Sequence, residues 1–195
     1  MPNNFGLLKN VRTASWECLL NYSECGSLPV SITDIASKTG IKIIRNSSVN
    51  IIPPDKASAA FFTDKQWYIV YNDEFTRQES RFRIARELGH ILLGHKQSVV
   101  FGSSTAELIR FLELEADVFA LGILAPEYVL YRINVHKAAE IAELCDISIE
   151  YARLRENSLK KRYRRSKINV PEYEQQVYIK FRDFTEDYLS QNNSS

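Results

Sequence analysis

The sequence has little cysteine, and its three thiols, Cys18, Cys25 and Cys145, form no paired CxxC spacing. An odd count without such spacing argues against a disulfide framework and against a cysteine zinc site. The chain also lacks a basic segment leading into an apolar run within residues 1–10, and no run of about 18 uncharged apolar residues occurs in it. We therefore expect a cytoplasmic protein with free thiols and no membrane-spanning segment.

The chain has almost no net charge, because 25 basic residues are offset by 24 acidic ones. Global attraction to nucleic acid or to a membrane is therefore not expected, and a charged partner would have to meet a local patch. Residues 153–167 hold eight Lys or Arg and one acid, whereas residues 107–117 hold four acids and one Arg. Apolar residues make up 45% of the 195, which predicts a folded domain with a core rather than disorder.

Hydrophobic periodicity predicts helices around a short sheet. Thr76, with Glu79 three residues on, has the spacing of a capping box and should open a helix that runs until Gly94. Residues 63–66 separate two short apolar runs and predict a hairpin. The expected helices are residues 7–20, 31–40, 76–94 and 105–124, and the expected strands are 41–44, 59–62 and 67–71. This order predicts an α+β domain with a small antiparallel sheet.

The C-terminal third predicts further helices. Residues 137–145 and 148–161 should form a helix-turn-helix-like unit, whose basic second helix could meet a phosphate backbone. A place in the protein body, a docking surface for a substrate or a plain solvated face are the other interpretations. A last helix and a frayed tail should follow. The expected domains are 1–135 as the main domain, 136–165 as the basic helical unit and 166–195 as the C-terminal helix and tail.

The run IARELGHILLGH at positions 84–95 holds the most informative pattern. Positions four apart on a helix lie about 40° from each other in projection, so two histidines with that spacing can bind one metal ion. Here the two positions are Arg86 and His90, with Glu87 beside them. A guanidinium has no lone pair to offer and stays protonated at physiological pH, so Arg86 cannot be a metal ligand.

This run, followed by LEADVFA at 114–120 and by Pro126, resembles the ImmA/IrrE family of metallo-endopeptidases. Members carry a hydrophobic strand, an HELGH helix and a second helix with the pattern E-A-N/D-x-F-A that ends at a proline. The strand at 68–72 is similar to theirs, and the resemblance extends over residues 7–162. It implies a zincin-like fold with a motif helix and a second ligand helix.

The resemblance also implies roles for individual residues. His90 corresponds to the second zinc ligand, Glu87 to the general base and Glu115 to the third ligand, with Glu113 as a weaker candidate for that ligand. Arg86 stands where the first ligand should be. Catalytic zinc ordinarily rests on three protein ligands and a water, so we expect zinc binding to be weak or absent.

Three outcomes at this site stay open from sequence alone. His95 could replace the missing ligand if the helix broke at Gly94 and folded back; otherwise it is a residue at the helix end that interacts with the last carbonyls. Glu87, His90 and Glu115 could together bind a harder ion. In the interpretation we favour, Arg86 occupies or borders the metal position and bridges Glu87 and Glu115, so that the fold persists without zinc.

Intact members of the family resemble one another in cleaving a helix-turn-helix repressor that is often encoded nearby, which relieves repression of a mobile element or a stress response. Two hypotheses follow for this chain. The first is a protease that acts on a cytoplasmic repressor or similar protein, with impaired activity or an unusual metal arrangement. The second is a pseudopeptidase that binds a protein through the same site without cutting it, or a DNA-associated regulatory module.

Overall fold

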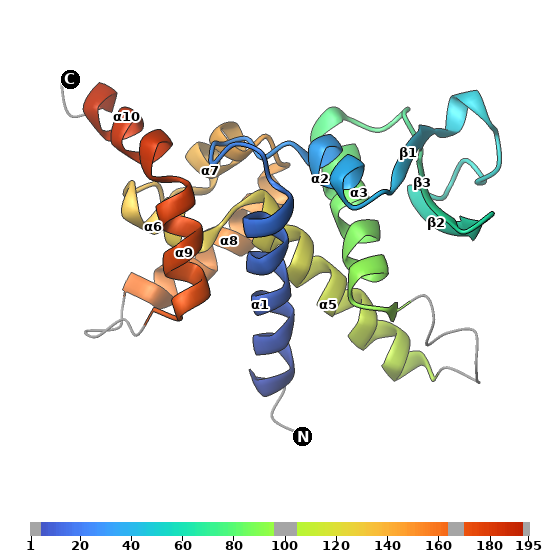
Figure 1. Cartoon of the computed structure of the whole chain (residues 1–195), viewed down its shortest axis with the longest axis horizontal. Coiled ribbons are helices and arrows are strands. Elements are labelled where there is room, and N and C mark those ends of the chain that lie inside the picture. The colour runs from blue at the N-terminus through green and yellow to red at the C-terminus, as the bar shows by residue number, and fades with distance from the viewer. Residues whose placement is uncertain (1–4, 96–104, 164–169, 193–195) are drawn as a thin grey trace.

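The computed structural model describes residues 5–95, 105–163 and 170–192 (Figure 1). A three-stranded sheet lies at one end of the structure, and helices form most of the other described residues. The helices are α1 (Phe5–Tyr22), α2 (Ile32–Lys38), α3 (Arg77–Leu92), α5 (Ala106–Leu124), α6 (Glu127–Arg132), α7 (Ala138–Cys145), α8 (Ile149–Tyr163), α9 (Glu172–Lys180) and α10 (Arg182–Asn192), with the 3₁₀ turn η1 (Asn46–Ser48). The α+β class expected from the sequence is confirmed. No helix within the described ranges is long and apolar enough to cross a bilayer.

The sheet consists of β1 (Lys42–Arg45), β2 (Ser58–Thr63) and β3 (Gln66–Tyr71), in the order β1-β3-β2. The predicted hairpin is confirmed: β2 and β3 are antiparallel, and Asp64 and Lys65 in the turn between them both have positive φ. The expectation of a purely antiparallel sheet is wrong, because β1 pairs with β3 in parallel. The reason is the long connection between β1 and β2, which places β2 at the far edge of the sheet. The chain then returns through the hairpin, and β3 fills the central position beside β1.

The sheet packs on α3 through one face. Alternation along β3 sends Ile69 into the main core and Val70 to the other face, where it forms a small second cluster with Ile52 and Ala59. Helix α3 contacts both β2 and β3. The sheet therefore braces one side of the helix that carries the sequence motif.

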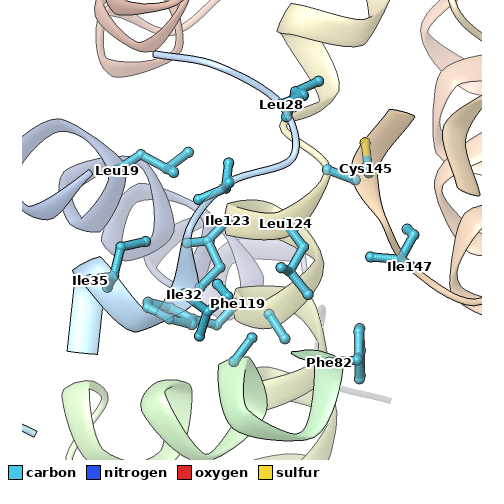
Figure 2. Close-up of a cluster of buried hydrophobic side chains, with 14 of the residues drawn as sticks. Leu19, Leu28, Ile32, Ile35, Phe82, Phe119, Ile123, Leu124, Cys145 and Ile147 are labelled. Carbon is cyan, nitrogen blue, oxygen red and sulfur yellow. The ribbon is translucent and has the colours of Figure 1, made fainter. Parts of the chain in front are cut away.

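The other side of α3 packs against α5, which in turn packs against α1. Figure 2 shows the apolar core that these helices share, with Leu19, Phe82, Phe119 and Ile123 all buried. The glycine of the motif, Gly89, lies at the crossing: a Cβ built on it would be only 3.0 Å from the ring of Phe119. The small residue lets α3 approach α5 closely, which brings their polar side chains together.

Helix α1 and α5 also meet at a glycine. A Cβ added to Gly122 would lie 2.4 Å from Oγ and 2.8 Å from Cβ of Ser15. We expect Gly122→Ala to lower the free energy of unfolding by about 1–3 kcal/mol, the usual cost of overpacking, as measured by urea denaturation. Ser15→Gly removes the obstructing atoms, so the same change should cost less in that background. Equal costs in both backgrounds would contradict this packing.

The two helices predicted for the helix-turn-helix-like unit are present as α7 and α8. Their turn contains Asp146 in the left-handed conformation, and its carboxylate lies 2.8 Å from Arg77 and 3.2 Å from Arg81 of α3. Tyr151 of α8 stacks on Phe82 of α3, with ring centroids 3.3 Å apart. These contacts hold α7 and α8 against the motif helix α3. The basic run continues into residues 164–169, outside the described part, so DNA contact stays a prediction, as does the domain division.

The C-terminal segment forms two helices where the sequence predicted one. Helices α9 and α10 are separated at Phe181, which is fully buried in the main core. Turning the chain there lets this ring reach the core while both helices stay on the outside of the body. Lys180 adds a hydrogen bond from its Nζ to the carbonyl of Leu20, 2.8 Å away, at the end of α1. The predicted frayed tail lies partly beyond the described residues.

Candidate functional site

Helices α3 and α5 present the residues singled out by the sequence. Each helix begins at a threonine whose hydroxyl accepts a hydrogen bond from a backbone amide of the first turn, Thr76 from Glu79 and Thr105 from Leu108. Because both starts are capped and the helices pack side by side, their polar residues meet at one interface. Glu87 and His90 of α3 are buried, and 20% of the Arg86 side chain is exposed.

The guanidinium of Arg86 lies between two carboxylates of α5. Its Nη2 pairs with Oε2 of Glu113, and its Nε lies 3.0 Å from Oδ1 of Asp117. The Nε contact lacks the alignment of a hydrogen bond and acts through charge. Glu113 and Asp117 are four residues apart and so share one face of α5. The prediction that Arg86 bridges Glu87 and Glu115 was wrong about these partners, because Glu115 lies on a different face of that helix.

Burial affects the acids at this interface. It raises the pKa of Asp117 above its ordinary value, an effect that the nearby Arg86 and Arg83 partly oppose. It also raises the pKa of Glu115, whose side chain is 13% exposed. Both shifts have desolvation as their largest cause, since a carboxylate loses hydration in such surroundings. A cation beside Asp117 is therefore favoured, and Arg86 supplies one.

His95 lies inside the site. Gly94 has φ +75°, so the chain leaves the helix there and turns back. Nδ1 of His95 comes within 3.1 Å of Nδ1 of His90, and Nε2 of His95 within 3.1 Å of Oε2 of Glu115. The fold-back that a ligand role for His95 requires is thus present, whereas the ligand role itself stays a prediction.

Glu87 has a partner that sequence reasoning missed. The hydroxyl of Ser58, at the start of β2, donates a hydrogen bond to Oε1 of Glu87, 3.1 Å away. Both side chains are buried. The only local signal was a small polar residue at the start of an apolar strand, and that is too common to identify a contact across 29 positions.

The residues present do not fit the zinc site that the resemblance implied. Arg86 stands where the resemblance places one ligand, and its guanidinium is paired with Glu113 and Asp117. Among the described residues, no three His, Cys, Asp or Glu side chains are arranged to hold one metal ion. The harder-ion alternative, formed by Glu87, His90 and Glu115, is not supported by this arrangement either. No zinc-dependent step can be derived from it.

Comparison with known proteins supports the resemblance at the level of the family. No curated protein matches the chain. The sequence model described as the IrrE N-terminal-like domain, peptidase family M78, matches residues 36–166, from the end of α2 to just past α8. The match covers 131 of the 195 residues and includes β1, the hairpin, α3 and α5. Because it extends over more than half of the sequence and spans the whole site, this chain belongs to the IrrE N-terminal-like domain family of M78 peptidases.

Proposed function

We propose that this protein uses a metallopeptidase fold to bind another protein and does not cut it by zinc-dependent proteolysis. The observation that carries the proposal is the pairing of Arg86 with Glu113 and Asp117. Family members are generally zinc-dependent peptidases. In this chain the permanently charged Arg86 stands at the position that the resemblance assigns to the first zinc ligand. The ion pair also joins α3 to α5, so the interface has a positive charge to offset its acids without a divalent ion.

Glu87 retains the position of the general base, but a base alone does not make a peptidase. In the metal-dependent mechanism the ion lowers the pKa of the attacking water and polarises the carbonyl, and both effects depend on a stable ligand set. The buried Glu87 is held by Ser58 on the sheet side of α3. We infer that it contributes to the packing of α3 on β2.

The partner we propose is a helix-turn-helix repressor in the cytoplasm, on the basis of the family resemblance. Binding would sequester the repressor, and the setting would be a mobile element or a stress response. Three partly exposed residues of α5 at the edge of the site suit a protein partner. The side chains of Glu113 and Asp117 are 40% and 45% exposed, and Leu114 between them is 43% exposed. Acidic and apolar groups therefore alternate along this stretch of α5.

The direct test mixes the purified chain with the small repressor encoded nearest to its own gene, with zinc added. We expect a stable complex by size-exclusion chromatography and an intact repressor on a denaturing gel. Leu114→Glu should weaken the complex, whereas Ile179→Glu on α9, at a position 63% exposed, should not. Cleavage of the repressor by the unaltered chain would overturn the proposal, and so would the absence of a complex between the two. Equal binding by the two variants would show that the partner does not use the surface around Leu114.

A further inference from the structure

One face of α8 is exposed from the start of the helix to Lys161. Its outward residues recur at the spacing of a single stripe and, at about 100° per residue, fall within an arc of about 140°. They are Ile149, Glu150, Arg153, Leu154, Asn157, Lys160 and Lys161. The opposite face holds Ala152, Arg155 and Leu159, all buried. Helix α8 is therefore anchored by one side and presents the other side to solvent.

The contacts that anchor α8 come from residues outside this stripe. Arg155 pairs with Glu127 of α6, and Tyr151 stacks on Phe82 of α3. Asp146, in the turn between α7 and α8, lies within ion-pair distance of two arginines of α3. The two helices and their turn are thus held in place without using the outward side chains.

The outward face is basic. Arg153, Lys160 and Lys161 supply three cations, and Glu150 is the one acid among the seven exposed residues. Glu156, at the edge of the face, pairs with Lys160 at 2.9 Å. The three cations still outnumber the two carboxylates, and two of them are adjacent. An anionic partner is therefore the one that the charge of this face complements.

We propose that the outward face of α8 is a DNA-binding surface, with α7 and α8 as a helix-turn-helix pair. In such pairs the second helix enters the major groove, and its N-terminal part contacts base edges. Glu150, Arg153 and Asn157 lie in that part, and they suit the edges of cytosine, guanine and adenine respectively. The two adjacent lysines lie about one turn further on, where they would meet phosphates.

The composition of the face favours DNA over an acidic protein. The buried centre of a protein interface is typically rich in aromatic side chains and poor in lysine and glutamate. None of the seven exposed residues is aromatic, and three are Lys or Glu. Leu154, which is 55% exposed, is compatible with DNA because the methyl group of thymine offers an apolar contact in the major groove.

The test measures binding of the full-length chain, without any repressor, to a fluorescein-labelled duplex of mixed sequence and about 20 base pairs, or two helical turns. Fluorescence anisotropy at several salt concentrations gives the affinity and its salt dependence. Lys160→Gln combined with Lys161→Gln should weaken binding and reduce the log–log salt slope by about 2, since each phosphate contact contributes about 1. Lys42→Gln combined with Lys65→Gln, at exposed positions of β1 and the hairpin turn, changes the net charge equally and should leave both quantities unchanged.

Two results would overturn the proposal. The first is no binding by the parent at about 50 mM salt, which would leave the face to solvent or to an acidic protein. The second is an equal loss in both double variants, which would assign binding to overall charge. Glutamine is a good helix former at exposed positions, and circular dichroism checks that the variants keep their helices. The result is independent of the proposed function, because the repressor is absent from the assay.

Discussion

An Arg86→His variant is expected to bind zinc more than about a hundredfold more tightly than the parent chain, since even the loss of an outer-shell partner costs about 10- to 100-fold in metal affinity. The substitution restores two imidazoles four positions apart on α3 and removes a fixed positive charge. It also frees Glu113 and Asp117 from their ion pair. Glu115 on α5 is the third ligand that the family pattern provides. Competition titration with a zinc chelator measures the effect directly.

Three companion variants make the result specific. Arg86→Leu removes the charge without adding a ligand and should gain no zinc affinity. Arg86→His combined with Glu87→Gln should bind zinc but should not cut a protein substrate that Arg86→His alone degrades. Arg86→His combined with His95→Ala should keep its zinc, because the restored ligand set does not include His95. Tight zinc binding by the parent would show that Arg86 does not block the site.

Arg155→Ala is expected to lower the free energy of unfolding by about 3–5 kcal/mol, the usual cost of removing one partner from a buried ion pair. The side chain of Arg155 is 8% exposed; its Nη1 lies 2.9 Å from Oε2 of Glu127, and its Nη2 donates to the carbonyl of Leu121 at 2.8 Å. Ser158 donates to the same Glu127 oxygen. Without the guanidinium, the carboxylate of Glu127 would stay in a largely buried position without its cation.

Thermal and urea denaturation measure this effect. For a protein of this size the expected drop in Tm is roughly 6 to 20 °C. Lys160→Ala is the matched control, because Lys160 pairs with Glu156 on the same helix at a distance of 2.9 Å but is 57% exposed, and exposed pairs contribute about 0–1 kcal/mol. A similar loss in both variants would mean that the buried network adds nothing beyond an ordinary surface pair. Such a result would also weaken the view that α8 is anchored in the body.

Local rules predicted much of the scaffold. The hairpin followed from two short apolar runs around residues 63–66, because a turn of that length joins antiparallel strands. Thr76 and Thr105 begin α3 and α5 as expected, since their hydroxyls satisfy amides that a helix start leaves without partners. Gly94 ends the motif helix because glycine tolerates positive φ. Each of these features depends on residues that are neighbours in sequence.

Contacts between distant segments were not predictable in the same way. The parallel pairing of β1 with β3 depends on the path of a long connection, and the break at Phe181 depends on a core that can accept its ring. Ser58 meets Glu87 only because β2 packs on α3. Nothing in the local sequence around any of these residues names its partner.

The same distinction between local and long-range features applies to the site. The sequence alone determined that position 86 carries a permanent charge and no lone pair, with Glu87 beside it and His90 four residues on. That an acidic second helix lies against them was implied by the family resemblance. The tertiary structure decided that Arg86 meets Glu113 and Asp117, and that His95 turns back onto His90. The physical reason is that ligand chemistry belongs to a side chain, whereas partner choice depends on the rotation of α5 against α3 and on one turn at Gly94.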